Sequence, residues 1–208
     1  MDIEYILPDK IENRSFEIIE NELGNRKIPD DIKPIVMRAI HTTADFDYYE
    51  NMFFSENVVE KALKTLKNGA VIVTDTNMTK AGINRKYLEK WDCEVRCFMA
   101  DADVAERAKI NGTTRAVASV DKASELKKPV IYAVGNAPTA LLRLCEHIEN
   151  KTFVPSVVIG VPVGFVNVVQ SKELIIKSGI PCIVARGRKG GSNVAAAICN
   201  ALLYMCGK

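Results

Sequence analysis

From Gly69 onward, short hydrophobic runs alternate with segments of helical spacing. Five runs rich in valine and isoleucine are each followed by Gly, Asn, Asp or Arg: AVIVTD, EVRCFM, PVIYAVG, PSVVIGV and PCIVARG. Most are continuously apolar, which is typical of strands covered on both faces. Helical spacing follows in NMTKAGINRKYLEKW, DADVAERAKI, APTALLRLCEHIE, QSKELIIKSG and SNVAAAICNALLYMCG. The alternation predicts right-handed βαβ crossovers and a doubly wound, mostly parallel sheet of five strands.

Residues 9 to about 68 have helical periodicity instead. DKIENRSFEIIENELG spaces its apolar residues for one helix and stops at Gly24, a usual helix terminator. Pro34 comes early in DDIKPIVMRAIHTTAD, where a helix tolerates proline. SENVVEKALKTLKNG begins with Ser55, a candidate N-cap, and ends in lysines and a glycine. Without a linker or internal repeat, the pattern predicts a single α/β domain over residues 1–208 with an N-terminal helical extension.

Composition narrows the class of protein. The chain has 208 residues, of which 48% are hydrophobic and 26% are charged, a balance that suits one soluble domain with one core. Lysine and arginine total 28 against 26 acids, and this interspersed, nearly neutral charge argues against nucleic-acid binding. No apolar run approaches the length of about 18 residues that a membrane span needs. The acidic N-terminus lacks a signal-peptide pattern, so we expect a cytoplasmic protein.

The six cysteines do not indicate a metal site or a disulfide framework. The chain has no CxxC pair and no Cys/His cluster with zinc spacing. Cys182, Cys199 and Cys206 lie inside apolar runs, where free cysteine behaves as a small core hydrophobe. We therefore expect no metal-binding residues.

The segment ARGRKGGSN, at the end of the last predicted strand, is the most informative loop. In open parallel sheets, ligands bind beyond the carboxyl ends of the strands. The segment offers Arg186, then Gly190, Gly191 and Ser192 at the start of the final helix, which is the pattern of a backbone anion site flanked by arginine. GRKGGS is not GxxxxGK(S/T) and GVPVGF is not GxGxxG, so a carboxylate is favoured over a nucleotide phosphate. The alternative is that the glycines only permit a tight turn.

Other polar residues near the strand ends are ambiguous. Asn136, in GNAPTALLRL, is predicted either to bind a ligand or to act as the N-cap of the helix that follows. Asp75, in TDTNM, has the same two interpretations. His147 lies near a helix C-terminus, where an imidazole commonly has a local structural role, and no function is assigned to it.

His41 lies in the helical stretch PIVMRAIHTTADFDYY. Arg38 precedes it by three residues and Asp45 follows it by four, so a continuous helix would set all three in one row. Arginine can hold an anionic group, and histidine can donate a proton near neutral pH. An aspartate touching the ring would orient it and favour its charged form. These residue types suit a general acid that acts on a polyanionic substrate, although a lone helical histidine is more often structural.

Seven motifs in order resemble those of the precorrin-8X methylmutase family: NRSFEII, RAIHTTADFD, TDTNMTKAGI, NGTTRA, GNAPTAL, GVPVGFVN and RGRKGGSN. The resemblance implies a flavodoxin-like three-layer α/β/α fold and a homodimer with active sites built from both subunits. It also implies migration of the ring C methyl group of a tetrapyrrole, precorrin-8, from C-11 to C-12. No added cofactor is implied, and any cobalt belongs to the substrate.

The resemblance carries over to individual residues. His41 corresponds to the catalytic histidine of the family, and Ser15 and Arg38 match positions that contact the substrate. The other substrate-binding residues expected within the matched motifs are Thr42, Arg115, Asn136, Arg186, Gly190, Gly191 and Ser192. One departure is Ala116, where the family often has serine, so a hydroxyl contact there is absent.

This reaction is compatible with the composition. A large flat ring with many carboxylates needs distributed arginines and apolar walls, and a pericyclic methyl shift needs one proton donor but no nucleophile or redox partner. Two alternatives remain open at this point: a nucleotide- or flavin-binding α/β enzyme, and a non-catalytic corrinoid carrier. The sequence does not distinguish a metal-free substrate from one that contains cobalt.

Overall fold

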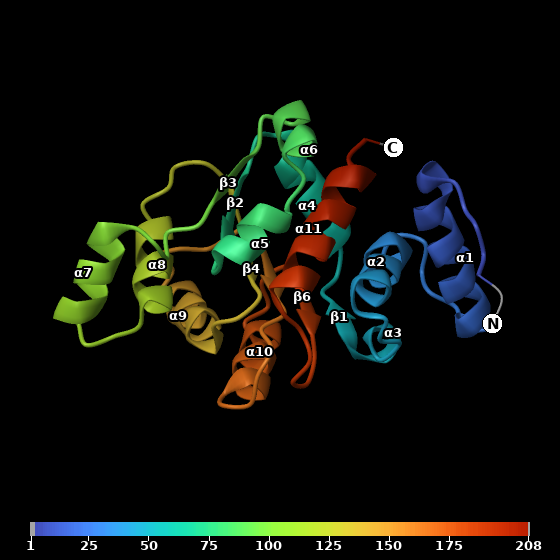
Figure 1. Cartoon of the computed structure of the whole chain (residues 1–208). Coiled ribbons are helices and arrows are strands. Elements are labelled where there is room, and N and C mark those ends of the chain that lie inside the picture. The colour runs from blue at the N-terminus through green and yellow to red at the C-terminus, as the bar shows by residue number, and fades with distance from the viewer. Residues whose placement is uncertain (1–2, 208) are drawn as a thin grey trace.

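Six strands form one sheet at the centre of the molecule (Figure 1). The computed structural model describes residues 3–207. The strands are β1 (Met52–Phe54), β2 (Val71–Thr74), β3 (Glu94–Arg96), β4 (Val130–Val134), β5 (Val157–Gly160) and β6 (Cys182–Ala185). They lie in the order β1-β6-β5-β4-β2-β3, and β2 to β6 are all parallel. The prediction of five parallel strands is confirmed, and their relative order is that of the flavodoxin-like fold.

The central strands are apolar on both faces because helices cover both faces. In β4, Ile131 and Ala133 belong to one hydrophobic core while Val130, Tyr132 and Val134 belong to the other. This division follows from the alternation of side chains along a strand. Burying one such large apolar side chain stabilises a fold by about 1.5–3 kcal/mol, which explains why these runs are almost entirely apolar.

Helices form a layer on each face of the sheet (Figure 1). One core is shared by α1, α2, α4, α6 and α11, and α5 contacts α11. The other core is shared by α7, α8, α9 and α10. The helices are η1 (Pro8–Lys10), α1 (Ile11–Leu23), α2 (Lys33–Thr43), α3 (Tyr48–Asn51), α4 (Val58–Lys67), α5 (Asn77–Gly82), α6 (Arg85–Lys90), α7 (Ala102–Ile110), α8 (Arg115–Ala123), α9 (Pro138–Glu149), α10 (Val168–Lys177) and α11 (Ser192–Met205).

The N-terminal extension is less purely helical than predicted. Within it, β1 pairs antiparallel with β6 and adds an edge strand to the sheet. Ser55 is not the N-cap of α4: that position is Asn57, and the Ser55 hydroxyl instead accepts the backbone N–H of Cys182 at 2.8 Å. Ser55 therefore connects the extension to the start of β6.

Two helical segments also differ from the prediction. The stretch after β2 forms two helices, because Ile83 is extended after the end of the first and Asn84 caps the second by accepting the N–H of Lys86. Helix α8 was not predicted, because its buried face consists mainly of alanines and one valine that carry a weak apolar signal. Its N-cap, Thr114, accepts the N–H of Val117 at 3.2 Å.

Candidate functional site

His41 lies in the last turn of α2, at an exposed position. The helix ends at Thr43, and Ala44 adopts a left-handed conformation that returns its N–H to the carbonyl of Ile40. The imidazole contacts the ring of Phe16 in α1, with centroids 5.3 Å apart. The side-chain hydrogen bonds that histidines make within residues 3–207 all belong to His147. Both ring nitrogens of His41 are therefore available to a ligand.

Arg38 lies one turn before His41 and links three helices. Its Nη1 donates to Glu12 Oε1 at 2.9 Å, and its guanidinium lies 5.5 Å from the centre of the Phe16 ring and 4.8 Å from that of Tyr204. The aromatic faces stabilise the cation and fix its plane. A guanidinium has five N–H donors, so the bond to Glu12 leaves others for a substrate carboxylate.

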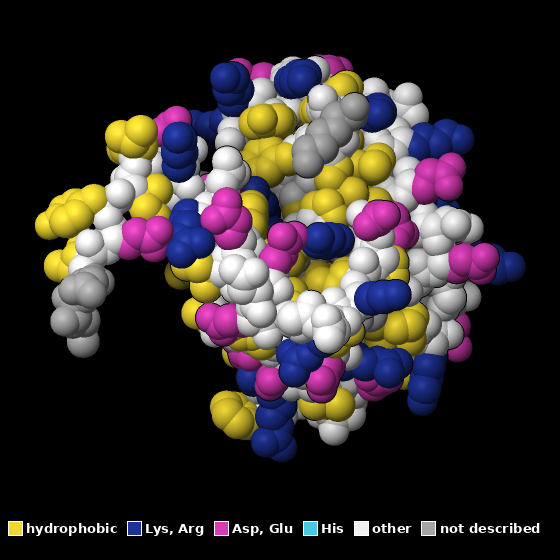
Figure 2. Space-filling model, turned by 90° about the vertical axis from the view of Figure 1, so that its right-hand side faces the viewer, with side chains coloured by type: hydrophobic (Ala, Val, Ile, Leu, Met, Phe, Trp, Pro, Cys, Tyr) yellow, Lys and Arg dark blue, Asp and Glu magenta, His cyan; other side chains and the backbone are white. Residues whose placement is uncertain are grey.

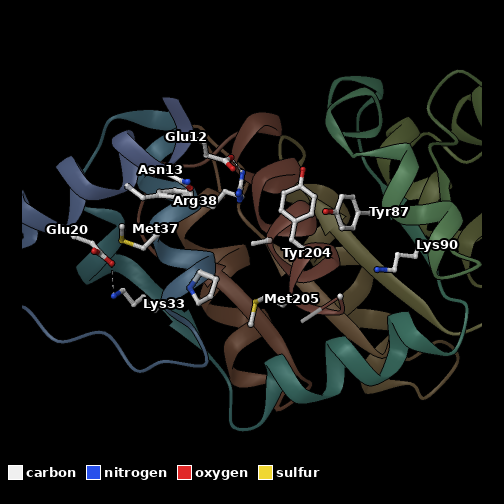
Figure 3. Close-up of a pocket in the computed structure, with 14 residues that line it drawn as sticks. Glu12, Asn13, Glu20, Lys33, Met37, Arg38, Tyr87, Lys90, Tyr204 and Met205 are labelled. Carbon is white, nitrogen blue, oxygen red and sulfur yellow. Dashed lines mark hydrogen bonds and ion pairs between the residues drawn. The ribbon is translucent and has the colours of Figure 1, made fainter. Parts of the chain in front are cut away.

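A groove of about 720 Å³ lies between α1 and the C-terminal end of α11 (Figure 3). Its apolar wall consists of Phe16, Met37, Tyr87, Tyr204 and Met205. Its cations are Arg38, Lys33 and Lys90, and its lining carboxylates, Glu12 and Glu20, pair with Arg38 at 2.9 Å and with Lys33 at 2.7 Å. The groove combines flat aromatic surface with separated cations, which suits a large apolar ring that carries carboxylates.

A second hollow, of about 250 Å³, holds His41 and Thr42. Arg38 lines both hollows, so they meet at this side chain. The opposite wall is provided by α11 through Asn193 and Asn200. The structure therefore brings together Arg38, His41 and Thr42, three of the predicted site residues.

Asp45 does not continue the row of Arg38 and His41, because α2 ends before it. Its carboxylate accepts the ammonium of Lys189 at 2.6 Å, and Asp47 accepts the same ammonium at 2.6 Å. The hydrogen bond from Lys189 lowers the pKa of Asp45. The interpretation that Asp45 orients the imidazole is wrong. Residues four apart share a face only within a continuous helix, and α2 ends at Thr43.

The glycine-rich loop before α11 is bound tightly to β5. The N–H of Gly191 donates to the carbonyl of Val161 at 2.8 Å. Gly190 has a φ of 157°, and a Cβ there would clash with the backbone oxygen of Val161. The Ser192 hydroxyl lies 2.8 Å from that of Thr76. Gly191 is the N-cap of α11, and a glycine has no side-chain oxygen that could accept the N–H groups of the first turn. Those N–H groups can therefore donate to a ligand.

Asp75 determines the shape of the loop after β4. It is 1% exposed, and its carboxylate accepts the backbone N–H groups of Gly135, Asn136 and Ala137 at 2.8, 2.8 and 2.7 Å. Burial raises its pKa, although these three hydrogen bonds oppose the shift. The N-cap of α9 is Ala137, so the N-cap interpretation of Asn136 is wrong. The Asn136 residue is exposed at the carboxyl edge of the sheet.

The remaining predicted residues are dispersed. Arg115 is the first residue of α8 and is exposed; this helix lies on the opposite side of the molecule from α2 (Figure 1). Arg186 stacks on Phe53 at 5.2 Å. The Ser15 hydroxyl donates to the carbonyl of Ile11 at 2.9 Å within α1. Arg115 therefore does not meet His41 within one chain, whereas Ser15 directly precedes Phe16, whose ring contacts the His41 imidazole.

Sequence reasoning missed Glu12 and Tyr204, the partners of Arg38. Helical periodicity places both on amphipathic helices but says nothing of which helices meet. Their proximity depends on the packing of α2 between α1 and α11. The sequence contains no local signal for it.

Within the described residues 3–207, no group of three or more His, Cys, Asp or Glu side chains lies close enough to hold a metal ion. All six cysteines are free, and Cys182, Cys199 and Cys206 are buried in the cores as predicted. Over the same residues, no helix combines the length and apolar character that a membrane crossing requires.

The sequence and fold match known proteins over nearly their whole length. A family model described as precorrin-8X methylmutase matches residues 10–205. A cobalt-precorrin-8 methylmutase of Salmonella typhimurium is 45% identical, with 95% of each chain covered. One of Priestia megaterium is 42% identical, covering 95% of this chain and 88% of the relative.

Solved structures agree with these relatives. A precorrin-8x methyl mutase structure from Thermus thermophilus superposes with a TM-score of 0.88 at 39% identity, covering 95% of this chain and 98% of that one. Because family model, relatives and structure all span nearly the full sequence, the chain belongs to the precorrin-8X methylmutase family.

Proposed function

We propose that His41 is the proton donor in the methyl migration from C-11 to C-12 of a precorrin-8 substrate. The family is one of isomerases in cobalamin biosynthesis. Protonation of the conjugated ring system by the imidazolium makes it electron-poor and favours the shift, after which the proton returns to the base. The observation that carries this role is that His41 lines a hollow beside Arg38 with neither ring nitrogen hydrogen-bonded in the described chain.

Substrate binding follows from the two adjoining hollows. Arg38 binds a peripheral carboxylate where the hollows meet, and Lys90 offers a second cation in the groove. Tyr87 and Tyr204, whose ring centroids are 4.5 Å apart, provide an aromatic wall for the macrocycle. Ser15 and Thr42 supply hydroxyl groups near this region. The loop residues Arg186, Gly190, Gly191 and Ser192 bind a carboxylate at the carboxyl edge of the sheet.

One experiment tests both whether the substrate contains cobalt and whether the enzyme needs an added cofactor. Relatives that are 41–45% identical are named cobalt-precorrin-8 methylmutases, which supports the cobalt-containing substrate. We expect no added cofactor, so turnover should survive treatment of the protein with a chelator. Substoichiometric protein is incubated with metal-free or cobalt-containing precorrin-8, and the absorption spectrum is followed. Conversion limited to one equivalent of protein would instead indicate a corrinoid carrier.

A homodimer with shared active sites accounts for the scattered residues. Arg115 lies on the opposite side of the molecule from the helix that carries His41, and a second copy would bring an equivalent arginine to the site. The N-terminal arm exposes apolar side chains at Ile3, Tyr5 and Leu7, which are 74%, 92% and 63% exposed (Figure 2). Such a projecting apolar segment suits an interface between copies.

The oligomeric state is measured by sedimentation equilibrium of the wild type and of Tyr5→Glu. The wild type should have twice the 23.0 kDa mass of one chain, and the variant should dissociate more readily. A wild type of one-chain mass at micromolar concentration would contradict the dimer. We also expect the protein in the cytoplasm.

A further inference from the structure

Lys172 in α10 is a buried lysine outside the site described above. Its residue is 0% exposed, and its ammonium donates to the carbonyl oxygens of Gly187 at 2.9 Å and Lys189 at 2.8 Å. No carboxylate forms an ion pair with it among the residues that the structure describes. Burying a charge without a counter-charge costs free energy, whereas an apolar side chain of similar length would fill the space without that cost. Because the charge is costly, we look for the role of Lys172 in its two hydrogen bonds to the carbonyl oxygens of the loop 186–191.

These bonds orient the backbone of the loop 186–191. The carbonyls of Gly187 and Lys189 are drawn to the buried ammonium, and the carbonyl of Arg188 accepts the N–H of Gly164 at 3.2 Å. Meanwhile Arg186, Arg188 and Lys189 are exposed residues. Carbonyl oxygens carry partial negative charge, so engaging them removes acceptors that would repel an incoming carboxylate. The loop then presents Arg188 to solvent, while Arg186 pairs with Glu173 at 3.4 Å and Lys189 pairs with two aspartates.

The same loop is joined to the end of α2. Lys189, whose carbonyl is held by Lys172, donates through its own ammonium to Asp45 and Asp47 at 2.6 Å each. Asp45 follows the last turn of α2, which carries His41. Hydrogen bonds at the carbonyl and at the ammonium of Lys189, with the N–H of Asp45 donating to Thr43 Oγ1 at 3.2 Å, thus connect α10 to the end of the helix of the proposed proton donor.

We propose that Lys172 is a positioning residue: it fixes the loop 186–191 for carboxylate binding and, through Lys189, the end of α2 that bears His41. The role rests on the proposed function, because the carboxylate is that of the tetrapyrrole. It does not require Lys172 to touch the substrate.

The test compares Lys172→Met with Lys177→Met. Methionine keeps an unbranched side chain but has no N–H donor, and Lys177 is an exposed lysine of the same helix. In Lys172→Met, hydrogen exchange of the amides in 187–191 should accelerate by about tenfold or more, because the loop opens locally. KM for precorrin-8 should rise by about tenfold or more, the loss expected when a charged hydrogen bond to the substrate is weakened. Lys177→Met should match the wild type in both measurements.

The proposal would be refuted if a folded Lys172→Met protein had the same amide hydrogen-exchange rates in 187–191 and the same KM as the wild type. If that variant does not fold, Lys189→Met replaces it, since this surface change cuts the link to α2 without disturbing the core. A fall in kcat then supports the role and unchanged kinetics refute it. Failure of the proposed function is distinguishable, because the wild type would not turn over precorrin-8 while the exchange measurement would still report on the loop.

Discussion

The two histidines of the chain occupy opposite environments. His147 uses both ring nitrogens: Nδ1 bonds Thr152 Oγ1 at 2.7 Å, and Nε2 bonds Asp121 Oδ1 at 2.9 Å. Its side chain is 11% exposed. His41 is exposed and contacts the ring of Phe16, and neither of its ring nitrogens is hydrogen-bonded to a side chain within residues 3–207. A histidine held at both nitrogens stabilises its surroundings, whereas one that is oriented but unbonded can exchange a proton with a ligand.

The largest effect should come from His41→Ala. The variant should fold and bind substrate, because the cations of the groove remain, but turnover should fall by about 10²–10⁴-fold, the usual contribution of a positioned proton donor. Steady-state kinetics and equilibrium titration with corrinoid measure the two properties separately. His147→Ala is the matched control and should keep wild-type turnover at low temperature. An unstable but active His41→Ala protein would assign His41 a structural role.

Arg38→Ala should change binding more than chemistry. Removing its guanidinium should raise KM by about 10–100-fold, as expected for the loss of a charged hydrogen bond to a carboxylate. Arg14→Ala is the control. Like Arg38, Arg14 forms ion pairs with carboxylates, here those of Glu4 and Glu17, but it does not line the groove. If both arginine variants have equal KM values, the substrate does not use Arg38.

His147→Ala should lose stability and keep its activity, which is the reverse of the result expected for His41→Ala. Loss of its two hydrogen bonds should lower the free energy of unfolding by about 1–2 kcal/mol, with kcat and KM unchanged. Urea unfolding and kinetics at low temperature measure these quantities. Reduced turnover in a folded His147→Ala protein would break the contrast between the two histidines.

The sequence predicted the central strands of the sheet but not its edge strand β1. Four of the five parallel strands, β2, β4, β5 and β6, were predictable because both of their faces are buried, which favours apolar residues throughout a run such as Val130–Val134. Strand β1 was not predictable, because three half-buried residues at the edge of a sheet carry no distinct pattern. Its pairing with β6 depends on a contact between distant parts of the chain.

For the candidate site, residue types were predictable but partners were not. The sequence distinguished His41 by its neighbour Arg38, three residues away on the same helix, and the structure brings both to one pair of hollows. It paired His41 with Asp45, whereas a left-handed Ala44 ends the helix and turns the carboxylate toward Lys189. Local spacing predicts neighbours only while the element continues.

The smallest predicted effect concerns the acid stability of the His147 region. Partial burial of Asp121 opposes its ionisation, but hydrogen bonds from His147 and Arg143 outweigh this, so the pKa of Asp121 is lowered. A carboxyl whose pKa is lower in the folded state stabilises the protein above its unfolded pKa, and the contribution disappears as pH falls through the folded value. Asp121→Asn removes this contribution at every pH. The free energy of unfolding should therefore differ most between wild type and variant at about pH 6, and the gap should narrow toward about pH 3, below the ordinary aspartate pKa.

Urea unfolding across this range tests the prediction, with Asp9→Asn as the control. Asp9 is exposed and forms no ion pair within the described residues, so its variant should follow the wild type throughout. A gap for Asp121→Asn that stays constant on acidification would mean that the carboxylate gains nothing from its partners on folding. His147 would then be held by packing against Phe153, 6.1 Å away between ring centroids, rather than by charge. The comparison with His41 would then depend on burial alone, because each ring would have an aromatic neighbour and neither would depend on an anion.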